Sequence, residues 1–205
     1  MRSAPAMICC WCAGPPMSAA RKPRAGSACC CTARGAIAVS RAPAVCSHGN
    51  PRAVHPSARN LGDDLIRAIA DQGGVIGAVG FPAFVSASPR PTIDQFIDRI
   101  AYLGDLVGVR HVALGLDDFA GQDGIAPPEV AAGLYRSFVS SGDRGPATYP
   151  PPPWRYPEGI EMPERMRALA PAVARRGSAA DEVRAIMGGN WLRVIDAVLT
   201  DDAAP

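Results

Sequence analysis

The sequence predicts a parallel α/β fold, in which strands and helices alternate along the chain. Three short segments between residues 44 and 116 are almost continuously apolar, which is typical of strands that are buried on both faces of a sheet. The segments between them repeat apolar residues at the spacing of a helix. Because three strands cannot close a barrel, we interpret them as the tail of a larger parallel α/β architecture.

The first β/α unit follows a short helical piece that begins at Ala36. The apolar run AVCSH at 44–48 has the length of a strand and ends on a histidine. The helix NLGDDLIRAIADQGG comes next, with Asn60 or Asp63 as its N-cap and a pair of glycines at its end. The run VIGAVGF at 75–81 is the second expected strand.

The second unit contains the clearest helix of the chain, TIDQFIDRIAYLGDLVG at 92–108. Its apolar residues recur at helical spacing, and Thr92 supplies a cap. The run HVALGL at 111–116 then predicts a third buried strand.

After residue 121 the pattern weakens. The segment ATYPPPPWRYPEGIEMP is rich in proline and aromatic residues, and it cannot pair into a central strand. Three helices are expected to close the chain, at 162–177, 179–189 and 190–200, and Ser178 starts the second of them.

The first 35 residues differ in composition from the rest. They hold six of the seven cysteines, and no carboxylate precedes Asp63. Adjacent cysteines suit neither a standard disulfide framework nor a zinc site with C-x-x-C spacing. We therefore expect residues 1–35 to be a disordered or non-native leader and residues 36–200 to be the folded domain. A cysteine-based metal site in this leader is a weaker alternative.

The overall charge and hydropathy exclude some classes of partner. A formal charge of +2 gives no electrostatic reason for nucleic-acid binding. The chain has no run of about 18 apolar residues, the length that a membrane-spanning helix requires. A cytoplasmic location fits the chain best, although the sequence does not determine it.

Two candidate reactive positions follow predicted strands. His48 ends the first strand, and Asp117, with Asp118 beside it, follows the third. In parallel β/α folds the reactive residues gather at the carboxyl ends of the strands, so we expect these side chains at the rims of neighbouring strands, facing one pocket. A neutral imidazole is a good zinc ligand, and a nearby carboxylate can accept a proton from metal-bound water.

Four blocks of sequence, in order, resemble the membrane dipeptidase (renal dipeptidase, M19) family. They are the segment SRAPAVCSHGNPRAVHPSARNLGDDLIRAIADQGGVIGAVGFPAF, the segment DLVGVRHVALGLDDFAG, the short block YPEGIEMPERM, and the closing segment EVRAIMGGNWLRVIDAV. The resemblance spans about residues 36–198.

The resemblance implies a TIM-type (β/α)8 barrel, of which this chain would be the C-terminal part, with a two-zinc centre that hydrolyses dipeptides with a free carboxyl end. His48 falls on a histidine that binds the second metal. Arg59 falls on the arginine that grips the terminal carboxylate of the substrate, a task suited to a bidentate guanidinium. Asp117 falls on the aspartate that accepts and donates the proton, and Asp118 is the alternative for this role.

Other family ligands have no counterpart in the sequence. The family's His-x-Asp pair, its bridging glutamate and a second histidine are not found. Since three or more protein ligands per zinc ion are usual, we expect a truncated chain with low or no activity alone. A non-catalytic remnant that only binds or assembles with partners is the alternative.

The remaining motifs are predicted to be structural. We assign no metal role to His55 or His111, and we interpret Gly188, Gly189 and Asn190 as a tight junction between helices. The family often forms dimers, so a homodimer is allowed, but packing within the barrel already accounts for the apolar stripes.

Overall fold

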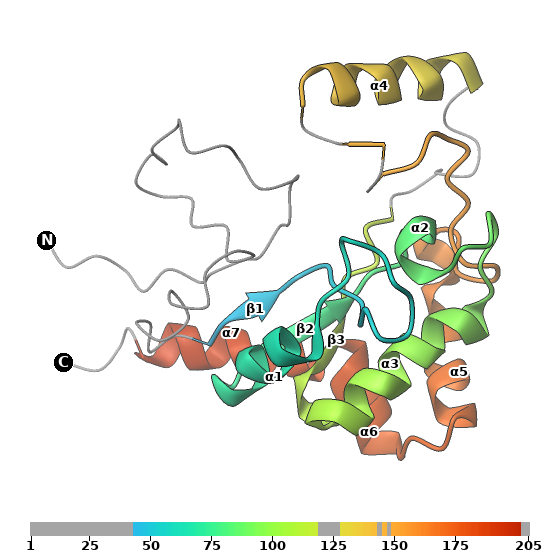
Figure 1. Cartoon of the computed structure of the whole chain (residues 1–205). Helices are drawn as coiled ribbons and strands as arrows, with labels where there is room; N and C mark the ends of the chain where they lie inside the picture. The colour runs from blue at the N-terminus through green and yellow to red at the C-terminus, as the bar shows by residue number, and fades with distance from the viewer. Residues whose placement is uncertain (1–42, 119–127, 143–144, 147–148, 202–205) are drawn as a thin grey trace, which may run out of the picture.

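A computed structural model describes residues 43–118, 128–142, 145–146 and 149–201. For residues 200 and 201 it describes the backbone alone. Figure 1 shows a small central sheet with helices around it. The predicted leader 1–35 and the predicted helical piece after Ala36 lie outside the described residues.

The sheet consists of three parallel strands in the order β1-β2-β3. They are β1 (Val45–Cys46), β2 (Val75–Ala78) and β3 (Val112–Leu114). The register pairs Val45 with Val75 and Ile76 with Val112. The predicted parallel α/β class is therefore confirmed, although each strand is shorter than its apolar run.

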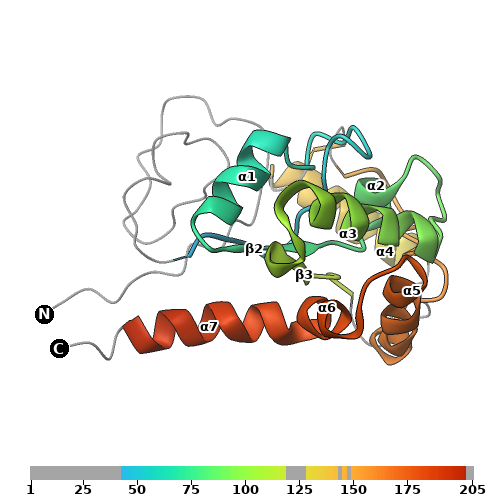
Figure 2. The ribbon, with the colours of Figure 1, turned by 90° about the horizontal axis from the view of Figure 1, so that it is seen from below.

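Helices cover both faces of this sheet. Figure 2 shows α1 (Asp63–Asp71) and α3 (Ile93–Val107) on one side and α7 (Asn190–Asp201) on the other. Alternate strand residues serve the two faces, because successive side chains of a strand point in opposite directions. Ile76 and Val112 belong to the core under α1 and α3, whereas their neighbours Val75 and Ala113 contact Val194 of α7.

The first residues of α3 and α1 test the predicted N-caps. In α3 the Thr92 side chain accepts a hydrogen bond from the backbone N–H of Gln95, which confirms the predicted cap, and the Gln95 side chain accepts one from the backbone N–H of Thr92, which completes a capping box. For α1 the cap prediction was wrong. Gly62 is the N-cap, so no side chain caps this helix, and the Asn60 amide donates instead to the carbonyls of His55 and Phe84.

Two helices were missed by the sequence pattern. These are α2 (Pro82–Val85) and α4 (Pro128–Ser140). The helix α2 is a single turn, too short to show periodicity. The helix α4 carries apolar residues at helical spacing, but none of its residues is buried, so it does not pack into the core as a helix with an apolar stripe usually does.

The three predicted closing helices are present in modified form. The first is a 3-10 turn (η5, Pro163–Ala168) followed by α5 (Leu169–Arg175). The second is α6 (Ala180–Arg184), which continues into η6 (Ala185–Gly189); non-helical backbone at Gly188 makes a kink there, and α7 follows. Ala179 precedes α6 where Ser178 was expected, because the Glu182 carboxylate accepts the Ala179 backbone N–H and replaces a side-chain cap.

The start of α7 is hydrogen-bonded to β3 and to the segments that lead into β2 and β3. Asn190 donates to the carbonyls of Val109 and Val112, at 2.8 and 2.7 Å, and Trp191 donates to Leu114. Arg193 donates to Gly73 and Arg110. The block GGNWLRV is thus a structural clasp, as the interpretation of Gly188–Asn190 as a helix junction requires.

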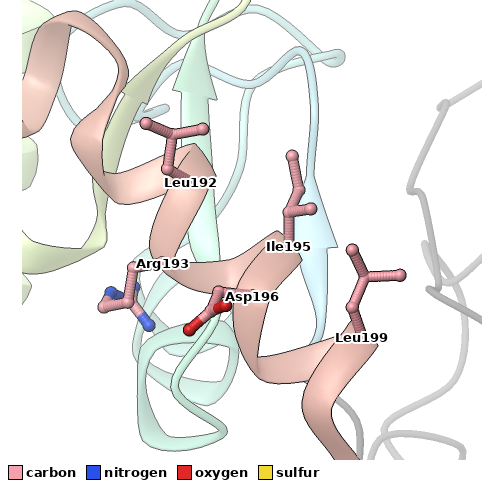
Figure 3. Close-up of a pocket in the computed structure, with 5 residues that line it drawn as sticks. All are labelled: Leu192, Arg193, Ile195, Asp196 and Leu199. Carbon is pink, nitrogen blue, oxygen red and sulfur yellow. The ribbon is translucent and has the colours of Figure 1, made fainter. Parts of the chain in front are cut away.

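The outer side of α7 carries exposed apolar side chains. Leu192, Ile195 and Leu199 project from it beside Arg193 and Asp196 and line a shallow hollow (Figure 3). No helix in the described part of the chain is both long and apolar enough to cross a membrane.

Candidate active site at the carboxyl end of the sheet

His48 and Asp117 meet just beyond the carboxyl ends of β1 and β3. The imidazole Nε2 lies 3.9 Å from the carboxylate Oδ1, and the two side chains are 27% and 47% exposed. They can therefore act on one small molecule. One detail of the expectation was wrong: the two strands are not neighbours, because β2 lies between them.

Two glycines allow this approach across β2. A Cβ atom on Gly77 would stand 2.3 Å from the carbonyl oxygen of Ser47, and a Cβ on Gly115 would stand 1.8 Å from it. Real Cβ contacts shorter than 3.0 Å are essentially never seen. The chain after β1 therefore crosses over the ends of β2 and β3 where these strands have no side chains, and it carries His48 towards Asp117.

His48 is held as a neutral imidazole. Burial lowers its pKa, and the charge of Arg59 lowers it further, against the opposing effect of Asp117. Its Nδ1 lies 2.7 Å from the Ser47 hydroxyl oxygen. When Nδ1 carries the proton and donates it to Ser47, Nε2 faces Asp117 as a second acceptor. Such a pair of acceptors favours a proton donor or a cation between them.

Asp117 has an unusual backbone. Its φ is +63°, and it is the only non-glycine residue with positive φ in the described part of the chain. Asp tolerates this left-handed region better than most residues, but such a conformation still costs on the order of 1 kcal/mol. The Tyr156 hydroxyl donates a 2.5 Å hydrogen bond to the Asp117 carbonyl oxygen.

Asp118 points to a different environment from Asp117. Its Oδ2 is buried and has no hydrogen-bond partner among the described residues. Burial raises the pKa of Asp118, as does the charge of Asp117, against a lowering by its own backbone N–H. An ion-pair contact joins His48 to Asp117 and none joins it to Asp118; the choice between Asp117 and Asp118 stays a prediction.

Arg59 lies in the loop between β1 and α1, where aromatic rings surround it. Its Nε donates to the Tyr149 hydroxyl at 3.1 Å, and its guanidinium carbon lies 5.4 Å from the ring centres of both Phe84 and Tyr149. Its Nη1 is buried and has no partner among the described residues. A buried guanidinium N–H without a partner is costly, and a carboxylate ligand would satisfy it.

Two asparagines fix the loop that carries Arg59. Asn50 exchanges hydrogen bonds with the backbone of Val79 and also donates to the Phe84 carbonyl. Asn60 donates to the same carbonyl and to that of His55. Both amides are almost fully buried. They are site-supporting residues that sequence reasoning missed, together with Tyr149 and Tyr156, because their partners are distant in sequence.

The two other histidines contact backbone carbonyls away from Asp117. His55 Nε2 lies 3.2 Å from the Ala83 oxygen, and His111 Nδ1 lies 2.8 Å from the Gly74 oxygen. Their structural role is supported by these contacts.

The donor set of the site is too small for a two-zinc centre. Zinc takes three or four protein ligands, at about 2.0–2.2 Å for nitrogen and oxygen. His48 and Asp117 are close enough to approach one ion together, but no group of three His, Cys, Asp or Glu side chains with metal-binding geometry occurs among the described residues. The described residues alone therefore do not fit the metal centre that the resemblance implies.

Comparison with known proteins agrees with the resemblance. The model of the family "Membrane dipeptidase (Peptidase family M19)" matches residues 27–133, which is more than half of the 205-residue chain. Dipeptidase aclJ of Aspergillus oryzae is 28% identical over 169 residues, which cover 82% of this chain and 32% of that protein. The chain thus spans about a third of the length of this curated relative.

Solved structures show the same fold. An amidohydrolase from Pseudomonas aeruginosa superposes with a TM-score of 0.67 at 26% identity, over 79% of this chain and 47% of that one. A metallopeptidase from Rhodobacter sphaeroides, solved with a phosphinate mimic of the dipeptide L-Ala-D-Ala, superposes with a TM-score of 0.57 at 24% identity, over 78% and 37% of the two chains.

A parallel sheet with helices on both faces, and with His48 and Asp117 at its carboxyl edge, places the chain in the parallel α/β class, to which the amidohydrolase structure described above also belongs. Within this class, the chain belongs to the membrane dipeptidase family, peptidase family M19. The family match begins at residue 27, inside the stretch 1–35, so the boundary at residue 35 stays a prediction.

Proposed function

We propose that the chain takes part in the hydrolysis of dipeptides with a free carboxyl end, with Arg59 binding the substrate and Asp117 transferring the proton. The observation that supports this most is the approach of His48 and Asp117 to 3.9 Å at the carboxyl edge of the sheet. These residues are 69 positions apart in the sequence, and glycines at the crossing allow the contact.

Arg59 is proposed to hold the terminal carboxylate of the substrate. Its Nε is already bound to Tyr149, whereas its Nη1 has no partner among the described residues. A carboxylate would supply the missing acceptor, and charge-assisted hydrogen bonds of this kind are about twice as strong as neutral ones.

Asp117 is proposed to accept a proton from the attacking water and to return it to the leaving amine. Its carboxylate is half exposed and faces His48, so a water molecule can reach both groups. Asp118 stays the alternative for this role. His48, being neutral, is proposed as a zinc ligand, because a neutral imidazole offers its Nε2 lone pair to the metal.

The proposed metal is zinc. Because the described residues provide too few donors for a zinc pair, we propose that this chain alone hydrolyses dipeptides slowly or not at all. The same observation favours the second candidate function, a non-catalytic module that only binds or assembles with partners. About two bound zinc ions per chain would support the enzyme, and a chain purified without metal that takes up none would support the module.

Substrate binding can be tested without turnover. The chain, labelled with ¹⁵N-arginine, would be titrated with L-Ala-D-Ala and with the C-terminal amide of the same dipeptide. We expect the Arg59 signals to respond to the carboxylate form alone, and Arg59→Lys to weaken binding by about tenfold or more, because lysine cannot make the bidentate contact. Equal responses to both ligands would refute the proposed role of Arg59.

A homodimer and a cytoplasmic location are further proposals. The family resemblance supports the first, and light scattering of the purified chain tests it. Fractionation of cells that express the chain tests the second.

A further inference from the structure

One segment of the chain contacts both halves of the candidate site. Tyr149 and Tyr156 lie in the proline-rich region that follows α4. The Tyr149 hydroxyl accepts a hydrogen bond from Arg59, which is 90 positions away in sequence, and the Tyr156 hydroxyl donates to the backbone of Asp117, which is 39 positions away. Arg59 lies in the loop between β1 and α1, and Asp117 follows β3, so this segment links two separate parts of the site.

Both tyrosines are held in place by packing. They are 9% and 5% exposed and belong to a cluster with Phe81 and Phe84. The Phe81 ring lies edge-on to both, with centre-to-centre distances of 5.5 Å to Tyr149 and 6.2 Å to Tyr156. Trp154 packs against the same cluster. Buried rings in such contacts have little rotamer freedom, so their hydroxyl groups are fixed in space.

The contact of Tyr149 determines which face of Arg59 is available. The Nε–H is bound to the hydroxyl, and the guanidinium lies over the rings of Phe84 and Tyr149. The unpartnered Nη1 lies on another edge of the same planar group. A planar group that is fixed at Nε keeps its remaining N–H groups in one orientation, as binding a carboxylate requires.

The contact of Tyr156 acts on the backbone of Asp117. This residue has a φ of +63°, a conformation that persists only where the surroundings hold it. The hydrogen bond to its carbonyl oxygen is such a restraint, and the direction of the carboxylate towards His48 depends on this backbone.

We propose that Tyr149 and Tyr156 are positioning residues of the peptidase site, with Tyr149 orienting Arg59 for the substrate carboxylate and Tyr156 orienting Asp117 for proton transfer. This inference rests on the proposed function. It predicts that the two tyrosines affect different steps, because they act through different residues.

The test uses Tyr149→Phe and Tyr156→Phe, which remove one hydroxyl each and keep the ring. Tyr102→Phe is the matched control, since its hydroxyl donates to Asp63 at 2.8 Å and makes no hydrogen bond to Arg59 or Asp117. We expect Tyr149→Phe to weaken binding of L-Ala-D-Ala about tenfold. We expect Tyr156→Phe to leave binding unchanged and to lower about tenfold any slow hydrolysis that the unsubstituted chain shows at saturating dipeptide. Equal effects of all three variants would overturn the proposal.

Nuclear magnetic resonance separates this inference from the proposed function. Tyr149→Phe should shift the Arg59 Nε–H signal, Tyr156→Phe should shift the carbonyl carbon of Asp117, and Tyr102→Phe should change neither. If the unsubstituted chain neither binds nor hydrolyses dipeptides, the proposed function fails. The role of the tyrosines in dipeptide hydrolysis then fails too, even if the signals still show both hydrogen bonds. If dipeptides bind but both signals stay unmoved, only the positioning proposal fails.

Solvent exchange of the Arg59 Nε–H can be measured in the unsubstituted chain, so the result does not depend on whether a variant folds. In the unsubstituted chain, the Nε–H of Arg59 should exchange with solvent more slowly than that of Arg52, an exposed residue of the same loop. Equal exchange rates would show that Tyr149 does not hold the guanidinium.

Discussion

Substituting Gly115 by alanine provides a direct test of how the site is assembled. The backbone of Gly115 has no positive φ, so alanine is allowed there by its conformation. The obstacle is a neighbouring atom: the new Cβ would lie 1.8 Å from the Ser47 carbonyl oxygen and 2.9 Å from the Ser47 carbonyl carbon. Both are backbone atoms, which cannot move aside by changing a rotamer.

The size of the effect follows from these distances. To reach the 3.0 Å limit of real Cβ contacts, the Ser47 oxygen must withdraw by more than about 1 Å, the scale of misplacement that can reduce catalysis about a hundredfold. His48 is the next residue in the chain and must move with it. Overpacking of this kind typically costs about 1–3 kcal/mol of unfolding free energy.

The assay combines urea unfolding with the NMR signals of the His48 ring. We expect Gly115→Ala to lower the free energy of unfolding and to shift these signals. Gly104→Ala is the control. Gly104 lies within α3, and a Cβ atom there would meet only Val109 Cγ2, at an ordinary contact distance of 3.5 Å. There, alanine should stabilise the helix by about 0.5–1 kcal/mol. The reasoning is refuted if Gly115→Ala is as stable as the unsubstituted chain and leaves His48 unmoved.

Three further predictions concern the clasp, a buried carboxylate and the histidine. Asn190→Ala removes one buried and one partly buried hydrogen bond and should cost about 2–3 kcal/mol in urea unfolding; a loss below about 0.5 kcal/mol would contradict the clasp. For Glu161, burial by itself raises the pKa, but backbone N–H groups and Arg165 outweigh it and lower the pKa below 4.5. The carboxylate therefore stabilises the fold above that pH and ceases to do so as the pH falls through the lowered pKa. Glu161→Gln should accordingly cost about 1–3 kcal/mol at pH 7 and progressively less below pH 4.5, and a pH-independent difference would count against this account. Finally, Asp117→Asn should lower the pKa of His48 further in an NMR titration, because it removes the one nearby group that raises it; an unchanged pKa would mean that the two side chains do not interact in solution.

Local sequence patterns were sufficient for the regular part of the fold. The capping box at Thr92 and the apolar spacing of α3 predict a helix from contacts within a few residues, and a continuous apolar run such as the one around Ile76 predicts a doubly buried strand. The predicted cap of α1 was wrong for a tertiary reason: the Asn60 amide nitrogen donates to the carbonyls of His55 and Phe84, which hold residue 60 in the loop, and the helix begins only at Asp63.

The sequence by itself determined the parallel β/α order, the positions of His48 and Asp117 at strand ends, and the family to which the chain belongs. Only the tertiary structure decided that these two residues meet across β2, that Ser47 passes over Gly77 and Gly115, and that distant tyrosines hold Arg59 and Asp117. The physical reason is the range of the interactions. Propensity and periodicity act over a few residues, whereas a hydrogen bond between residues 90 positions apart depends on how the whole chain packs, which no local pattern records.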